Sequence, residues 1–336
     1  MTLGYIQGPA GRITGLVLFL AGLALPFFVY PVFAIHLACF ALVAVSFDLL
    51  LGFTGLLSFG QALFWGGGAY AATILSGKAG APFLVALGCG VLYAALLALA
   101  VGAVSVRRSG IYFAMITLAI AQIQYFLAFQ LVDLTGGENG IQIATRGTLF
   151  GLSLENDRVF YYVVLLFVTL GVAFTVRVVG SPFGAVLTAM RENEQRARSI
   201  GYDTARFKLG AFVMSGALAG LAGSLFAIGN HLSGLDGVDW HTSGAIVMMT
   251  ILGGIGTIYG PIVGAALFES LEFFVSKTPI GDKTNVVMGA IFALVILIAR
   301  RGIVGEILAR ATRRKPVAEE EDPPGLLGDR EATAAT

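Results

Sequence analysis

Apolar stretches close to 20 residues long recur along almost the whole of this chain. About 20 residues of α-helix cross the roughly 30 Å hydrocarbon core of a bilayer, and backbone polar groups in lipid must be satisfied within the protein. The pattern therefore predicts an all-α, polytopic transmembrane helical bundle of about ten spans (8–10). The predicted spans are 13–30, 32–51, 56–76, 82–106, 111–132, 159–179, 207–229, 244–258, 261–276 and 284–300.

Two places leave the number of spans open. The first stretch, 13–30, could be a signal peptide, but a second apolar stretch follows almost at once and no cleavage site precedes a polar domain. It is therefore interpreted as the first span. The eighth and ninth stretches are short and are divided by Gly253, Gly254, Gly256 and Gly260. These two could instead form one interrupted, partly re-entrant element.

The composition favours a membrane protein over a soluble one. Hydrophobic residues make up 57% of the chain and charged residues 12%, with a mean hydropathy of +0.86, whereas a soluble domain carries about 25% charged residues. Cys39 and Cys89 lie in apolar runs, so buried packing is expected rather than a disulfide or a metal site. No basic run is interleaved with aromatic residues as nucleic-acid binding requires.

The distribution of basic residues predicts the orientation. With the N-terminus inside, 16 of the 21 Lys and Arg residues fall on the cytoplasmic side, as the positive-inside rule requires. Both termini are therefore predicted to be cytoplasmic. The predicted organisation is a cytoplasmic N-terminus (1–12), a transmembrane domain (13–300) with an outer loop (133–158) and a cytoplasmic loop (180–208), and a largely disordered cytoplasmic tail (301–336).

The cytoplasmic loop 180–208 has the signals of a surface helix. Ser181 is a suitable N-cap, Pro182 a suitable first residue, and Gly201 a suitable left-handed end. The interpretation is either a solvated connector or a docking helix for a cytoplasmic partner. The residues expected to support the helix are the i,i+4 pairs Glu192/Arg196 and Glu194/Arg198 and the small or apolar residues Ala185, Met190 and Ala197.

Polar side chains inside the spans are candidates for a translocation pathway, because polar groups in lipid must face the bundle interior or a wet cavity. They could equally form hydrogen bonds to neighbouring helices. The candidates are Ser58, Gln61 and Trp65, predicted on one helix face, and Thr117 and Gln124, predicted with Ala121 on another.

Two glycine-interrupted segments, 52–68 and 252–264, lie in opposite halves of the chain. Paired breaks of this kind accompany the transport path in other transporters. The glycines predicted to act as flexible breaks are Gly52, Gly55, Gly60, Gly253, Gly254 and Gly256.

Asp48, Glu269 and Glu272 are the acidic residues within the predicted spans. A charge there is costly unless it is paired or hydrated. Asp48 is expected near an interface, and the two glutamates, one turn apart, suggest a wet face. The histidines have no companions at metal-ligand spacing, so no metal site is predicted.

Five blocks in order along residues 48 to 270 resemble the branched-chain amino-acid ABC transporter permeases, the LivH/LivM family and in particular its LivM type. The sequence is GFTGLLSFGQA at 52–62, GIYFAM at 110–115, TGG at 135–137, AMRENE at 189–194 and GGIGT at 253–257. Each block is short, and the ordered set carries the resemblance. Asp48 departs from it, because a neutral, asparagine-like residue is expected before the Leu-Leu-Leu-Gly run.

The resemblance implies a permease subunit of an ATP-binding-cassette importer in the bacterial inner membrane. It implies a second permease of the LivH type, two ABC ATPase subunits and a substrate-binding protein. The chain lacks a G-x-x-x-x-G-K-[ST] motif, so no cofactor is expected on it, and ATP and Mg²⁺ belong to the partner subunits. An ion-gradient-driven secondary transporter or channel is the alternative. A membrane enzyme is disfavoured, because no catalytic constellation is found.

The resemblance also assigns roles to two loops. Contact with the ATPase is expected at Arg191, Glu192, Asn193, Glu194, Arg196, Arg198 and Gly201. The outer loop needs conformational freedom at its glycines, and a flexible surface loop is the simpler interpretation. In an importer this loop would contact the binding protein through Gly136, Gly137, Glu138 and Asn139.

Overall fold

The computed structural model describes residues 9–149, 151–278, 284–298 and 302–306. Each predicted span overlaps one α-helix of at least 14 residues, which confirms the all-α prediction. These helices are α2 (Pro9–Phe28), α3 (Pro31–Asp48), α4 (Gln61–Ala79), α5 (Phe83–Ser105), α6 (Ile111–Gln130), α8 (Asp157–Val179), α11 (Thr204–Asn230), α12 (Trp240–Gly253), α13 (Tyr259–Ser276) and α14 (Thr284–Ile298).

Shorter elements connect the long helices. They are the π-helical turn η1 (Leu49–Thr54), α7 (Val132–Thr135), α9 (Pro182–Glu192), α10 (Glu194–Ser199) and the 3₁₀ turns η2 (Gly137–Asn139) and η3 (Leu235–Val238). Two antiparallel pairs of two-residue strands join β1 (Ile141–Gln142) to β4 (Leu232–Ser233) and β2 (Thr148–Leu149) to β3 (Leu152–Ser153). The tail prediction for 307–336 lies outside the described residues.

Several helices are suited to a membrane. Within the described residues, five have the length and apolar composition to cross one: α3 extended by η1, α5, α6, α8 and α11. The segment Ile13–Phe28 of α2 is a shorter apolar helix. The architecture is therefore a multi-pass helical membrane bundle.

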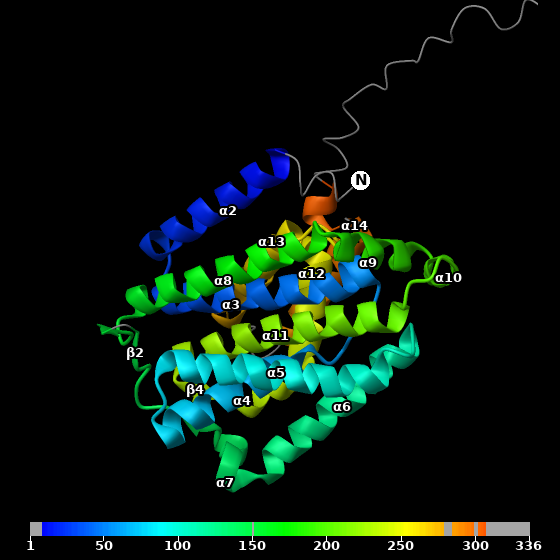
Figure 1. Cartoon of the computed structure of the whole chain (residues 1–336). Coiled ribbons are helices and arrows are strands. Elements are labelled where there is room, and N and C mark those ends of the chain that lie inside the picture. Colours follow the sequence, from blue (N-terminus) through cyan, green and yellow to red (C-terminus); the bar gives the residue numbers. More distant parts are fainter. Residues whose placement is uncertain (1–8, 150, 279–283, 299–301, 307–336) are drawn as a thin grey trace, which may run out of the picture.

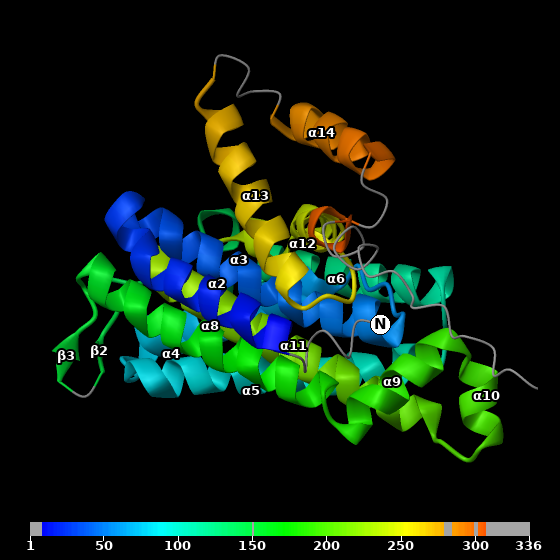
Figure 2. The ribbon, with the colours of Figure 1, turned by 90° about the horizontal axis from the view of Figure 1, so that it is seen from above.

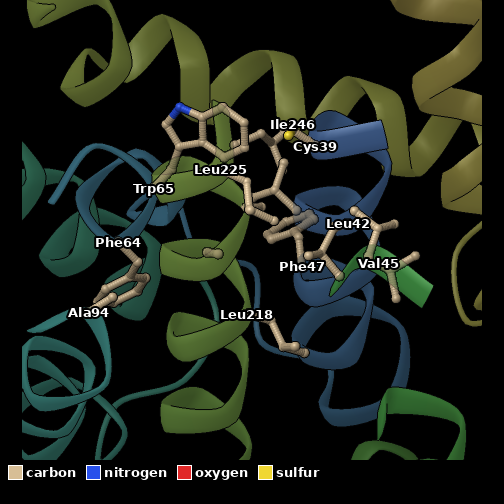
Figure 3. Close-up of a cluster of buried hydrophobic side chains, with 14 of the residues drawn as sticks. Cys39, Leu42, Val45, Phe47, Phe64, Trp65, Ala94, Leu218, Leu225 and Ile246 are labelled. Carbon is tan, nitrogen blue, oxygen red and sulfur yellow. The ribbon is translucent and has the colours of Figure 1, made fainter. Parts of the chain in front are cut away.

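Helix α11 forms the centre of the bundle and packs against α3, α4 and α5. Leu218 and Leu225 of α11 lie among buried side chains from α3, α4 and α12 (Figure 3). Glycines allow the closest approaches: a Cβ atom on Gly68 of α4 would lie 2.6 Å from the Cα atom of Gly220. Close packing of small residues is how helices associate in lipid, where burial of apolar surface gives little gain.

The loops gather at the two ends of the bundle as the charge pattern predicts. Figure 1 shows α9, α10 and the α5–α6 connection at one end, and α7 and the β2–β3 hairpin at the other. The first end carries the predicted cytoplasmic loops, and the second carries the predicted outer loop.

Helix α12 departs from the predicted span. It has only 14 residues, fewer than the about 20 needed to cross a bilayer, and Figure 2 shows it nearly end-on while α3 and α8 lie across the view. Its two ends remain near the middle of the bundle, since Ser243 bonds to Ala62 and Thr250 to the carbonyl of Ala44. The interrupted-element alternative therefore describes α12 and α13 better than two complete spans.

Candidate functional site

The cytoplasmic loop forms two helices where the sequence predicted one. The backbone is extended at Asn193, with φ of −157°, between α9 and α10. The side chain of Asn193 accepts a hydrogen bond from the backbone N–H of Arg196 at 2.9 Å. Asn193 thus begins a new helix as an N-cap, and the prediction of a continuous helix was wrong.

The predicted ends of this segment are partly confirmed. Pro182 occupies the first turn of α9, and Gly201 has the left-handed φ of 96°. Ser181 does not cap the helix with its side chain, because its hydroxyl donates to the carbonyl of Val178 at 2.6 Å.

One of the two predicted ion pairs is formed. Glu194 pairs with Arg198 at 2.8 Å and with Lys208 of α11 at 2.7 Å, and accepts a hydrogen bond from Thr204 at 3.1 Å. Burial alone would raise the pKa of Glu194, but the hydrogen bonds and positive charges of these neighbours hold it below its usual value. The carboxylate therefore ties α10 to the start of α11.

The other predicted pair, Glu192 with Arg196, is absent among the ion pairs of the described residues. The helix break at Asn193 lies between the two residues, so their i,i+4 spacing no longer places them on one helix face. Both side chains are exposed.

The remaining surface of α9 and α10 is mostly solvent-facing. Met190 and Ala197 are buried as predicted, whereas Ala185 is exposed. Ile200 is 69% exposed and Tyr202 42%, although neither was selected from the sequence. An apolar residue between Arg198 and the left-handed Gly201 could have indicated a contact surface, because the helix ends there and leaves the side chain outside the packing.

Arg191 is exposed, and its guanidinium reaches η1. Its Nη1 donates a hydrogen bond to the carbonyl oxygen of Gly52 in η1. A Cβ atom on Gly55 would lie 3.2 Å from the side chain of Arg191, and one on Gly256 would lie 3.3 Å from Nη1. Arg191 therefore brings α9 and both glycine-interrupted segments together.

Asp48 lies inside this junction and is fully buried, and its expected position near a membrane interface stays a prediction. Its two carboxylate oxygens accept hydrogen bonds from the backbone N–H groups of Gly256 at 2.7 Å and Ile258 at 3.2 Å. The side chain that departs from the family pattern thus holds the turn between α12 and α13.

The glycine breaks have specific structural reasons. Gly55, Gly254 and Gly256 have φ values of 76°, 122° and 76°, which favour glycine. A Cβ atom on Gly52 would collide with Asp48 and lie 2.6 Å from the backbone nitrogen of Gly256. Gly60 has φ of −104° and Gly253 is helical, so close packing accounts for these two.

The predicted face of Ser58, Gln61 and Trp65 is not a single helix face. Residues 55–60 are non-helical and α4 begins at Gln61. The left-handed Gly55 ends η1, and the hydroxyl of Ser58 accepts a bond from the N–H of Gly60 at 3.2 Å. The side chain of Trp65 stacks on Phe40 with ring centroids 4.9 Å apart.

The predicted translocation residues bond within the bundle. The amide of Gln61 donates to Ser215 at 2.9 Å, Thr117 accepts from the N–H of Phe59 at 3.2 Å, and Gln124 donates to the carbonyl of Leu63 at 3.0 Å. Within the described residues, four buried oxygens lack a hydrogen-bond partner: Gln61 Oε1, Tyr70 OH, Gln124 Oε1 and Ser233 Oγ. The bonds match the helix-bonding alternative, and the role in translocation stays a prediction.

A cavity of about 700 Å³ opens between α2, α3, α8 and α13. Its walls are mainly apolar and contain none of the five predicted translocation residues. The acidic residues of α13 lie elsewhere, with Glu269 buried and Glu272 exposed. No cluster of potential metal ligands occurs in the described ranges.

The outer loop uses its glycines at left-handed positions. Gly136, Gly137 and Gly140 have φ values of 77°, 57° and 67°, as the glycine-rich pattern predicted. Glu138 and Asn139 are exposed, whereas Gly137 is buried. The contact of this loop with a binding protein stays a prediction.

Arg146 anchors the other part of the loop and is only 4% exposed. Its guanidinium pairs with Asp157 at 2.7 Å, donates to the carbonyl of Gly229 at 2.7 Å, and lies 4.9 Å from the ring centre of Phe160. From the sequence, Arg146 was only one of the basic residues predicted to lie on the outer side, and its burial was not predicted.

Comparison with known proteins gives a consistent family. Residues 32–299 match the model of the branched-chain amino acid transport system permease component. The LivM permease protein of Escherichia coli K12, from a high-affinity branched-chain amino acid transport system, is 31% identical over 251 residues. These cover 68% of this chain and 59% of the relative. A probable LivM permease of Methanocaldococcus jannaschii is 26% identical over 264 residues, covering 68% of this chain and 75% of that protein.

A shorter similarity extends to another import system. The autoinducer 2 import permease LsrC of Yersinia pestis is 36% identical over 97 residues, which cover 27% of each chain. The match spans 59% of the length of the Escherichia coli relative. No solved structure matches this chain.

Proposed function

This chain belongs to the family of branched-chain amino acid transport system permease components, and we propose that it forms half of the translocation pathway of an ATP-driven importer. The observation that carries the proposal is the position of the α9–α10 segment, which exposes charged and apolar side chains at one end of the bundle and contacts the glycine breaks through Arg191.

The proposal requires partners for energy supply. The sequence has no G-x-x-x-x-G-K-[ST] phosphate loop, so ATP and Mg²⁺ are bound by two separate ATPase subunits. The exposed surface of Glu192, Asn193, Arg196, Arg198 and Ile200 is the proposed ATPase contact. Its mixture of charges and one apolar side chain suits docking into a groove of another protein.

A second permease completes the pathway. Gln61 of α4 and Thr117 of α6 are enclosed by packing, and the cavity between α2, α3, α8 and α13 is lined mainly by apolar groups. A polar route for an amino acid is therefore proposed between this subunit and a partner of the LivH type. The complex lies in the bacterial inner membrane, and the outer loop, with exposed Glu138 and Asn139, meets a substrate-binding protein.

The mechanism is alternating access. ATP draws the two ATPases together, α9 and α10 move with them, and the interface between the permeases opens toward the binding protein. A ligand or a partner shifts such an equilibrium only by its differential affinity for the two states. Branched-chain amino acids are the proposed substrates.

Purification in mild detergent followed by reconstitution tests this function. The expected result is co-purification of a second permease and an ATPase, and ATP-dependent uptake of labelled leucine that requires the binding protein. Valine and isoleucine should compete for uptake, whereas lysine serves as a charged control and should not.

An ion-gradient-driven transporter is distinguished in the same vesicles. Uptake that is abolished by an uncoupler but unchanged when ATP hydrolysis is blocked would replace the importer proposal by that alternative. Uptake that survives the uncoupler and requires ATP supports the importer.

A further inference from the structure

We propose that Asp48 and Arg191 are positioning residues that transmit movement of α9 to the turn 254–258 between α12 and α13, an inference that rests on the proposed importer function. The two side chains and the backbone that they contact are called the latch below. They join three segments that are far apart in sequence: η1, α9 and the turn.

Asp48 attaches the turn to α3. Its carboxylate receives the N–H groups of Gly256 and Ile258 at 2.7 Å and 3.2 Å, and the side chain is fully buried. A carboxylate oxygen that accepts backbone N–H bonds makes a strong, directional contact. If the turn moves relative to α3, these two hydrogen bonds must break. If they stay intact, the end of α3 must move with the turn.

Arg191 attaches α9 to the same place. Its guanidinium donates to the carbonyl of Gly52, and a Cβ atom on Gly52 would collide with the Asp48 carboxylate. Displacement of α9 would therefore break a hydrogen bond to a residue that lies directly against Asp48.

The latch has little free space. A Cβ atom on Gly52 would collide with the Asp48 carboxylate and lie 2.6 Å from the nitrogen of Gly256. A Cβ atom on Gly256 would lie 3.3 Å from Nη1 of Arg191 and from the carbonyl oxygen of Gly52. In contacts this close, a shift of α9 displaces the turn, because packed groups move together.

The backbone of the latch departs from regular helix on both sides. Residues Leu49–Thr54 are π-helical, a form that is rare and concentrated at functional sites. Ile258 has a φ of 57°, which strains a β-branched residue. Strain of this kind persists where neighbouring contacts impose it, and here the hydrogen bond from Ile258 to Asp48 is such a contact.

The turn 254–258 is connected through α12 to the buried polar residues at the start of α4. Thr257 links both sides of it, since its hydroxyl donates to the carbonyl of Gly254 at 2.7 Å and accepts from the N–H of Gly260 at 3.1 Å. Farther along α12, Ser243 accepts the N–H of Ala62 at 2.9 Å, next to Gln61. A route of direct contacts thus runs from α9 to the first turn of α4.

The first experiment is a double-mutant cycle in the complete reconstituted complex. The variants are Arg191→Met, Asp48→Asn and the double variant. Arg108→Met is the matched control, because Arg108 is an exposed arginine at the same end of the bundle and lies outside the proposed ATPase contact. The quantity measured is the amount of amino acid transported per ATP hydrolysed.

Arg191→Met should lower this ratio by about tenfold, within the range of known coupling between sites. Asp48→Asn should have a smaller effect, because the amide retains one acceptor oxygen. The double variant should resemble Arg191→Met, since both changes break one connection. Losses that multiply in the double variant would overturn the latch, as would an Arg191→Met ratio equal to that of Arg108→Met.

A second measurement leaves the latch intact. Ile255, which is 37% exposed in the turn, is replaced as Ile255→Cys in a Cys89→Ala background and labelled with a maleimide. The labelling rate should change several-fold between the nucleotide-free and vanadate-trapped complexes, while Leu152→Cys at the outer end should not respond. Equal rates at position 255 in the two states would overturn the proposal even if Arg191→Met fails to fold.

The two proposals fail in different ways. A wild-type complex without ATP-dependent transport rejects the importer function and the latch with it. A wild-type complex that transports, with no response at position 255 and no coupling between positions 48 and 191, rejects the latch alone.

Discussion

The two ends of the bundle each contain an arginine that contacts a glycine carbonyl on another segment, but the two are built differently. At the outer end, Arg146 is buried, pairs directly with Asp157 and packs on Phe160. At the cytoplasmic end, Arg191 is exposed, and its guanidinium donates to the carbonyl of Gly52 without a carboxylate partner among the ion pairs of the described residues.

The difference separates a structural anchor from a movable contact. The outer arginine is enclosed by direct partners, and its release would leave a buried charge unpaired. The cytoplasmic arginine lies beside a π-helical turn and a residue with positive φ, where alternative backbone arrangements cost less. We expect the outer end to determine stability and the cytoplasmic end to determine coupling.

The largest effect on stability is expected from Arg146→Ala. The change leaves the carbonyl of Gly229 and the carboxylate of Asp157 without this donor, and should lower the free energy of unfolding by about 3 kcal/mol. Thermal unfolding in detergent measures it, with the exposed Arg158→Ala as control. Equal melting temperatures for the two variants would remove the distinction between the ends.

Gly52→Ala should affect transport more than stability. The added methyl group collides with Asp48 and the turn, and overpacking of this kind costs about 1–3 kcal/mol. Gly244→Ala on α12 is the control, since a Cβ atom there meets nothing within 4 Å. Unfolding and uptake per ATP are measured for both; a Gly52→Ala protein with native uptake would contradict a tightly packed cytoplasmic junction.

Acidification should loosen α10 before the rest of the bundle. The folded-state pKa of Glu194 lies below its unfolded value, so its contribution is fully present above about pH 4.3, the ordinary value for a glutamate. It is lost as the pH falls through the folded pKa. Hydrogen exchange of residues 194–208 measures the change, and Glu194→Gln should remove this pH dependence. Parallel profiles in the two proteins would argue against the role of the ion pairs.

Glu192→Ala should have the smallest effect. Glu192 is exposed and forms no ion pair with Arg196 in the described structure, so the free energy of unfolding should change by less than about 0.5 kcal/mol. Thermal unfolding checks this value. A larger loss would indicate that α9 and α10 form one continuous helix in solution, as the sequence alone predicted.

The helices were predictable to within a few residues, because each apolar run satisfies its backbone locally and must be helical in lipid. The exceptions occur where a polar side chain or a glycine changes the local backbone. Asn193 divides the predicted cytoplasmic helix, and the left-handed Gly55 is the first of the non-helical residues 55–60. Asparagine and glycine both occur where helices are interrupted, but whether they interrupt a helix at a given position depends on the tertiary contacts there.

The candidate site was predicted in pieces. The helical loop 180–208 and the glycine breaks were predicted from the sequence. Their contact through Arg191 was not, because Arg191 and Gly52 are 139 residues apart in sequence. The candidate polar residues of α4 and α6 were found as polar side chains in apolar runs. Their hydrogen bonds to α11 and to the α4 backbone depend on how the helices pack.

The sequence by itself determined a helical membrane protein with segregated loop charges, since hydropathy and charge act through local chain length and position. Only the tertiary structure decided what Asp48 does. Its partners in the turn lie 208 and 210 residues along the chain, and no local pattern specifies a hydrogen bond across that separation. The buried carboxylate is accommodated because folding brings two backbone N–H groups to it.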